Sequence, residues 1–184
     1  MDTIAVYFEK RVKTYGFLVS QDLSMVVFHI RPEFLAEWSE KIRTWKDAGI
    51  NFRLVLTQRS SDEEVLFLLV LESRYQAYLF GCAGVSVHQN RGKFVRADSP
   101  VEMIHFQGPH FGDRYGILDI ALDALSRGGI PVLAAACTGA SISLILPEKA
   151  AEPAKALLED VYEIPKRSLS RQQPSQGLLR SSLK

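Results

Sequence analysis

Hydrophobic positions in the second half of the chain form short apolar runs separated by one amphipathic stripe. They predict strands at 101–107, 130–136 and 140–146, a helix over 115–127, and a second helix from 147, or from about 152, to about 160. The first helix repeats its apolar residues at helical spacing and stops at Gly128-Gly129. We expect Val161–Ile164 to close the sheet as a short final strand.

The first half repeats this order. The pattern predicts strands at 24–30, 51–58 and 65–71, a helix over 33–47 and a short helix over 73–80. Gly49-Ile50 ends its long helix as Gly129-Ile130 ends the other, 80 residues later. The repeat predicts an α+β protein of two ferredoxin-like βαββαβ units, each an antiparallel sheet with helices on one face. Between the units we expect a hairpin in 84–98 around Asn90-Arg91-Gly92.

The run Val65–Leu71 contains no polar residue. Such a strand is typical of burial on both faces, whereas helices cover only one face of a ferredoxin-like sheet. The second face therefore needs a cover, either a second copy of the chain or sheet-to-sheet packing between the two units. We expect a dimer.

Composition and charge narrow the class of protein. The 184 residues are 47% hydrophobic and 23% charged, which is ordinary for a globular protein of one or two domains. No apolar run approaches the ~20 residues that span a bilayer, so we expect a cytoplasmic protein without a membrane partner. Two cysteines do not form a disulfide framework, and we expect Cys82 and Cys137 to be buried thiols.

The segment 166–184 has a charge of +5 and no acid, which leaves −4 for residues 1–165. Its few apolar residues cannot offset the entropy of ordering, and we expect a disordered basic tail. Such a tail can contact nucleic acid or an acidic partner, but scattered charges without aromatics favour a solubilising terminus. We do not expect nucleic-acid binding.

The chemistry-bearing residues do not form an active site. The histidines, at positions 29, 88, 105 and 110, lack metal-ligand spacing, and no phosphate-binding glycine motif occurs. No base can be placed beside Cys137. RNA recognition motifs share the predicted topology, but Phe28 and Phe106 lack a basic-aromatic series around them. We expect no catalytic residue, no metal and no cofactor, and therefore no enzyme.

The loop before the 115–127 helix carries the strongest motif. Asp113-Arg114-Tyr115-Gly116-Ile117-Leu118 resembles the Asp-Arg-Pro-Gly-Ile-Leu signature of ACT domains, and Ala136–Ser143 continues the match to the second ACT domain of aspartokinases. Tyr115 replaces the usual proline. In the first half, Ala48-Gly49-Ile50-Asn51 and Leu56-Thr57-Gln58 resemble the first ACT domain. The chain thus resembles a tandem ACT regulatory region without its kinase domain.

The resemblance implies a division into units 12–82 and 83–165. It also implies that an N-terminal strand, Thr14–Val19 or Ile4–Phe8, joins the second unit's sheet. It implies a non-catalytic sensor of a small metabolite, an amino acid, working with an enzyme of amino-acid metabolism. The alternative is a structural interaction subunit that has lost ligand binding.

The ligand site expected from these arguments is the start of the 115–127 helix. Backbone amides there can receive a carboxylate, although a tight turn that only packs the helix gives the same spacing. The expected binding residues are Asp113, Arg114, Tyr115, Gly116, Ile117 and Leu118, bordered by Ala136, Cys137 and Thr138, with Gln58 at the matching place in the first unit.

Overall fold

The computed structural model describes residues 11–59, 64–82, 93–109 and 111–164. Its main sheet has six strands in the order β3-β4-β2-β5-β7-β6. The strands are β1 Val12–Lys13, β2 Phe17–Ile30, β3 Phe52–Arg59, β4 Val65–Glu72, β5 Lys93–Gln107, β6 Ala134–Cys137, β7 Ser141–Pro147 and β8 Tyr162–Glu163. The α-helices are α1 Leu35–Asp47, α2 Gln76–Cys82, α3 Ile117–Arg127 and α4 Ala151–Val161. None of the described helices is long and apolar enough to cross a membrane.

Two long strands belong to both halves of the molecule. The C-terminal half of β2 pairs with β4 and with the start of β5, while its N-terminal residues Phe17–Ser20 pair with the end of β5. The first unit is β3-β4-β2-β5 with α1 and α2, and the second unit is β2-β5-β7-β6 with α3 and α4. The predicted fold of two ferredoxin-like units is confirmed, and β2 joins the second unit's sheet near the expected Thr14–Val19.

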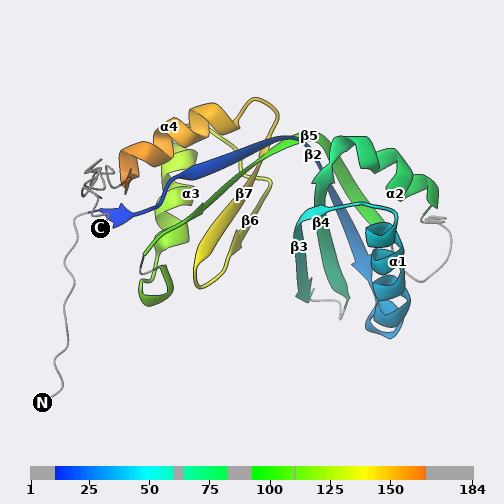
Figure 1. Ribbon diagram of the computed structural model, residues 1–184. Coiled ribbons are helices and arrows are strands. Elements are labelled where there is room, and N and C mark those ends of the chain that lie inside the picture. The colour runs from blue at the N-terminus through cyan, green and yellow to red at the C-terminus, as the bar shows by residue number, and fades with distance from the viewer. Residues whose placement is uncertain (1–10, 60–63, 83–92, 110, 165–184) are drawn as a thin grey trace, which may run out of the picture.

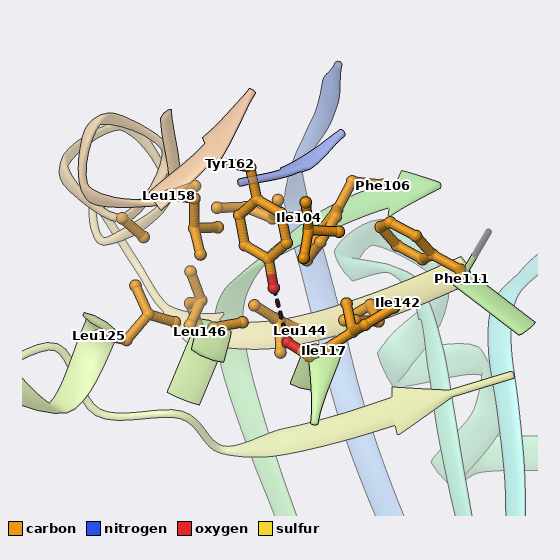
Figure 2. Close-up of a cluster of buried hydrophobic side chains, with 14 residues drawn as sticks. Ile104, Phe106, Phe111, Ile117, Leu125, Ile142, Leu144, Leu146, Leu158 and Tyr162 are labelled. Atoms are coloured by element: carbon orange, nitrogen blue, oxygen red, sulfur yellow. Dashed lines mark hydrogen bonds between the residues drawn. The ribbon is translucent and has the colours of Figure 1, made fainter. Parts of the chain in front are cut away.

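The two units form a V that is joined where the paired strands β2 and β5 pass from one unit into the other, with the helix pairs on its outer sides (Figure 1). Under α1, the aromatic residues Trp38 and Trp45 pack on Phe28 and Leu69. Under α3 and α4, the core gathers Phe106, Leu125, Leu144, Leu158 and Tyr162 (Figure 2). Each helix pair thus covers one face of its half-sheet.

The helix-free faces meet near this junction. Leu68 and Val70 of β4 share one buried cluster with Met103 and Ile145 of the second unit, whereas Leu69 and Leu71 lie under the helices. Alternate residues of β4 are therefore buried on opposite faces. Sheet-to-sheet packing within one chain supplies the cover that Val65–Leu71 requires, and the dimer stays a prediction.

The helices α1 and α3 end with the same backbone motif. Gly49 and Gly129 adopt left-handed φ angles of 85° and 72°. The amide of Ile50 donates to the Trp45 carbonyl, and that of Ile130 donates to the Leu125 carbonyl, at 3.0 and 2.9 Å. These are Schellman motifs, in which the residue after the glycine packs on the last turn. The repeated Gly-Ile pairs are therefore helix stops, as the sequence predicts.

An acidic residue inside the apolar strand β5 links this strand to α4 in the second unit. Glu102 of β5 is 5% exposed, and its Oε2 accepts a 2.7 Å hydrogen bond from the Ala151 amide at the start of α4. Its Oε1 accepts from the Gln21 side chain at 3.3 Å. The carboxylate thus caps α4 and favours its N-terminal dipole.

Several predicted elements were wrong in detail. The strand at 161–164 does not close the main sheet, because β8 pairs in parallel with β1. Residues 93–98, expected in a hairpin, are part of β5 and pair with β2. The strand expected at 130–136 begins at Ala134, because Pro131 lacks an amide hydrogen for the ladder. The helix predicted to start at 147 or at about 152 is α4, and it starts at Ala151, close to the later of these two positions.

Other expectations lie outside the described residues. They concern Ile4–Phe8, the turn Asn90-Arg91-Gly92, His88, His110, the side chain of Cys82 and the basic tail. The division of the chain into 12–82 and 83–165 stays a prediction.

Candidate functional site

The start of α3 presents backbone donors. Gly116 precedes the helix with a left-handed φ of 77°, and no side chain caps the helix. The amide of Ile120 donates to the Gly116 carbonyl at 3.0 Å, so the helical ladder begins there. The amides of Ile117, Leu118 and Asp119 therefore have no acceptor within the helix. They lie at the positive end of the helix dipole, where an anion is stabilised.

The loop before α3 is anchored at one end. Phe111 is buried, and its ring meets Phe106 edge to face with centroids 6.0 Å apart. Gly112 follows, and a Cβ at this position would lie 2.9 Å from the Gly139 carbonyl oxygen. The loop therefore rests directly against the turn between β6 and β7.

That turn is closed by its own side chain. The amide of Thr138 donates to the Ser141 carbonyl at 2.9 Å, and Thr138 Oγ1 accepts from the Ser141 amide at 3.1 Å. Cys137 and Thr138 are both exposed beside the loop. The expectation of a buried Cys137 was wrong: β6 is an edge strand that ends at this residue, and no further strand of the described residues pairs with its outer side.

Tyr162 contacts the first turn of α3 from the hydrophobic core. Its hydroxyl donates a 2.6 Å hydrogen bond to the Ile117 carbonyl inside the core cluster (Figure 2). Burial raises the pKa of Tyr162 well above its ordinary value, and the nearby Cys137 adds to the rise. The sequence argument placed Tyr162 only in a final strand, because a contact 45 residues away leaves no local pattern.

The structure gathers most of the expected binding residues but not all. Asp113, Tyr115 and Gly116 are exposed and Arg114 is partly exposed, so the site is an open surface. Ala136 pairs with Ser143 and Cys137 with Ile142, so strand alternation directs Ala136 to the helix-free face, away from the helix start. Gln58 is exposed on β3 of the first unit, apart from this loop.

Replacing Tyr162 with phenylalanine tests the support under α3. We expect a loss of about 1 kcal/mol in the free energy of unfolding at neutral pH, because the Ile117 carbonyl keeps its helical partner. The raised pKa means that the folded state keeps a proton that the unfolded state releases. Stability should therefore fall as the pH rises above about 10, by up to ~1.4 kcal/mol per pH unit, and the variant should lack this part of the slope.

Urea unfolding between about pH 8 and pH 11 measures both effects. Tyr115→Phe is the matched control, because Tyr115 is fully exposed and should change neither value. If the free energy of unfolding falls equally steeply with rising pH in wild type and in Tyr162→Phe, the role given to Tyr162 is contradicted.

Comparison with known proteins supports the fold. No protein-family model matches the chain, and no curated protein sequence matches it. The regulatory subunit of aspartate kinase from Thermus thermophilus, in a ligand-free form, superposes with a TM-score of 0.67 at 12% identity, over 84% of this chain and 100% of that one. Aspartate kinase from Synechocystis gives 0.68 at 14% identity, over 86% of this chain and 29% of that one.

A third structure, E. coli aspartokinase III in complex with lysine and aspartate, gives a TM-score of 0.55 at 12% identity, over 85% of this chain and 35% of that one. The chain therefore has the fold of the regulatory region of aspartate kinases. At these identities the likeness concerns the arrangement of strands and helices.

Proposed function

We propose that the chain is a non-catalytic regulatory module that senses a free amino acid at the start of α3. The observation that carries the proposal is the set of helix-start amides at Ile117–Asp119, held beside the β6–β7 turn by Gly112 and Gly139. Regulatory subunits of aspartate kinase share the fold, and one related kinase was crystallised with lysine and aspartate.

The bound amino acid should place its α-carboxylate on the amides of Ile117 and Leu118, where the helix dipole adds to the hydrogen bonds. Its ammonium should face Asp113, the acid of this loop. Its side chain should lie along Cys137 and Thr138. The helix-free orientation of Ala136 removes that residue from the proposed contact set.

Binding should reach the rest of the molecule through shared parts. The first turn of α3 accepts a hydrogen bond from Tyr162, and β2 and β5 connect the second unit to the first. We therefore infer that occupancy changes the packing of the two units, and through it a partner. We propose that this partner is an enzyme of amino-acid metabolism in the cytoplasm, engaged by a homodimer of this chain.

One observation favours the alternative, a structural interaction subunit. Tyr115 at the tip of the loop is fully exposed, and Tyr15 and Leu18 are 67% and 63% exposed. Exposed large apolar side chains are common at protein contacts.

A panel of amino acids in a thermal-unfolding assay tests ligand binding. We expect at least one amino acid, at ~100 times its dissociation constant, to stabilise the chain by ~2.7 kcal/mol. Gly116→Val should remove the part of this stabilisation that arises at the start of α3, since valine disfavours the left-handed backbone that aims the amides.

Gly49→Val is the matched control. It introduces the same left-handed strain at φ 85° in the first unit, far from the site, so the ligand effect should persist. If no amino acid stabilises wild type, the interaction-subunit function replaces the sensor. If Gly116→Val keeps the whole effect for every amino acid, the start of α3 is not the sensor site.

A further inference from the structure

A polar hollow lies where β2 passes from one unit to the other. Gln21 and Asp22 are skipped in the pairing of β2 with β5, which passes from Ser20–Met103 to Leu23–Val101. These two residues form a bulge opposite Glu102, and Asp22 has a left-handed φ of 54°. A cavity of about 400 Å³ opens beside the bulge.

The cavity wall comes from the bulge and from the first unit. It is lined by Ser20, Gln21, Asp22, Leu23, Arg53, Glu72, Ser73 and Arg74. A bulge re-aims the side chains of its strand, and here the bulge shares the cavity wall with the start of β3 and the end of β4. The volume lies within the range of small-molecule sites.

The charges on the wall are arranged in two groups. Arg53 Nη2 lies 3.4 Å from Glu72 Oε1, and Arg74 Nη2 lies 2.7 Å from Glu72 Oε2. One carboxylate thus orients two guanidinium groups, each of which has further N–H donors for a second anion. Both arginines are about half or more exposed, so these ion pairs rearrange at little cost.

Asp22 supplies the opposite charge. It lines the same cavity, and it makes no ion pair or hydrogen bond with another side chain in the described part of the protein. The two arginines, Glu72 and Asp22 together have no net charge. A ligand that complements this wall carries one anionic and one cationic group.

We propose that this cavity binds a free α-amino acid, with its carboxylate on Arg53 and Arg74 and its ammonium on Asp22. The site is separate from the start of α3 and does not depend on it. Its occupant touches the bulge and the first unit at once. The Gln21 side chain in the bulge donates a hydrogen bond to Glu102, and Glu102 caps α4. Direct contacts therefore connect a ligand in this cavity to the second unit.

Isothermal titration calorimetry with the twenty amino acids tests the site on the full chain. We expect saturable binding that weakens at least about tenfold in Arg53→Gln/Arg74→Gln, because two charge-assisted hydrogen bonds are lost. Asp22→Asn should weaken binding similarly while it keeps the fold, since asparagine tolerates the left-handed backbone. N-acetyl and methyl-ester forms of the same amino acid should each bind at least about tenfold more weakly.

Arg43→Gln is the matched control, because Arg43 is an exposed arginine that pairs with Glu40 on α1. It should leave the affinity unchanged, as should Gly116→Val for this site. Unchanged affinity in Arg53→Gln/Arg74→Gln overturns the proposal, as does the absence of binding by any amino acid. Binding abolished by Gly116→Val alone also overturns it, while supporting the site at α3.

Discussion

Replacing Glu102 with alanine should lower the free energy of unfolding by about 2–3 kcal/mol. The change removes a buried carboxylate and leaves the amide of Ala151, itself fully buried, without its 2.7 Å acceptor. It also removes the acceptor of Gln21, which lies in the β2 bulge between the two units. Urea unfolding followed by circular dichroism and by tryptophan fluorescence measures the loss.

Both tryptophans of the chain lie in α1 of the first unit, whereas Glu102 caps a helix of the second. Because β2 and β5 run through both units, the units should unfold together, and the fluorescence midpoint should shift as far as the dichroism midpoint. Glu152→Ala is the matched control, an exposed acid in the first turn of α4 that should cost no more than ~0.5 kcal/mol. If the urea midpoint followed by tryptophan fluorescence is the same in Glu102→Ala as in wild type, the two units unfold independently.

Replacing Trp45 with alanine should have the largest effect, a loss of about 3–5 kcal/mol. Trp45 is 1% exposed and lies against the rings of Trp38 and Phe52, each with centroids 6.3 Å away. Removal of the indole leaves a cavity that these neighbours cannot fill. Circular dichroism should show one transition at lower denaturant for the whole chain.

The adjacent Lys46 provides the control for Trp45. It is exposed on the same turn of α1, and Lys46→Ala should change stability by less than ~0.5 kcal/mol. Two separate dichroism transitions in Trp45→Ala, one unshifted, would contradict the shared-strand architecture.

Local rules predicted the parts of the fold that depend on neighbouring residues. The helix over 33–47 and the stops at Gly49 and Gly129 need only helical spacing and left-handed glycine, and these elements formed as expected. Only part of each long strand was predicted. Gln21-Asp22 and Asp98-Ser99-Pro100 have the composition of turns, yet both segments lie inside long strands, because β2 and β5 pair on either side of them.

For the candidate site, too, the sequence predicted local features and missed contacts between distant segments. The sequence motif located the loop 113–118, because its glycine and helix start are local features. Contacts between distant segments left no such signal, including Tyr162 with Ile117 and Gly112 with Gly139. Glu102 did carry a signal, since a single acid within the apolar run 101–106 indicates a buried polar partner.

The proposed sensor site is tested most directly by nuclear magnetic resonance of ¹⁵N-labelled protein during titration with the amino-acid panel. The account predicts saturable shifts of the Ile117, Leu118 and Asp119 amide signals with at least one amino acid, and their absence in Gly116→Val. If every amino acid leaves these three signals unmoved, the start of α3 is not a ligand site and the chain is not a sensor of the proposed kind.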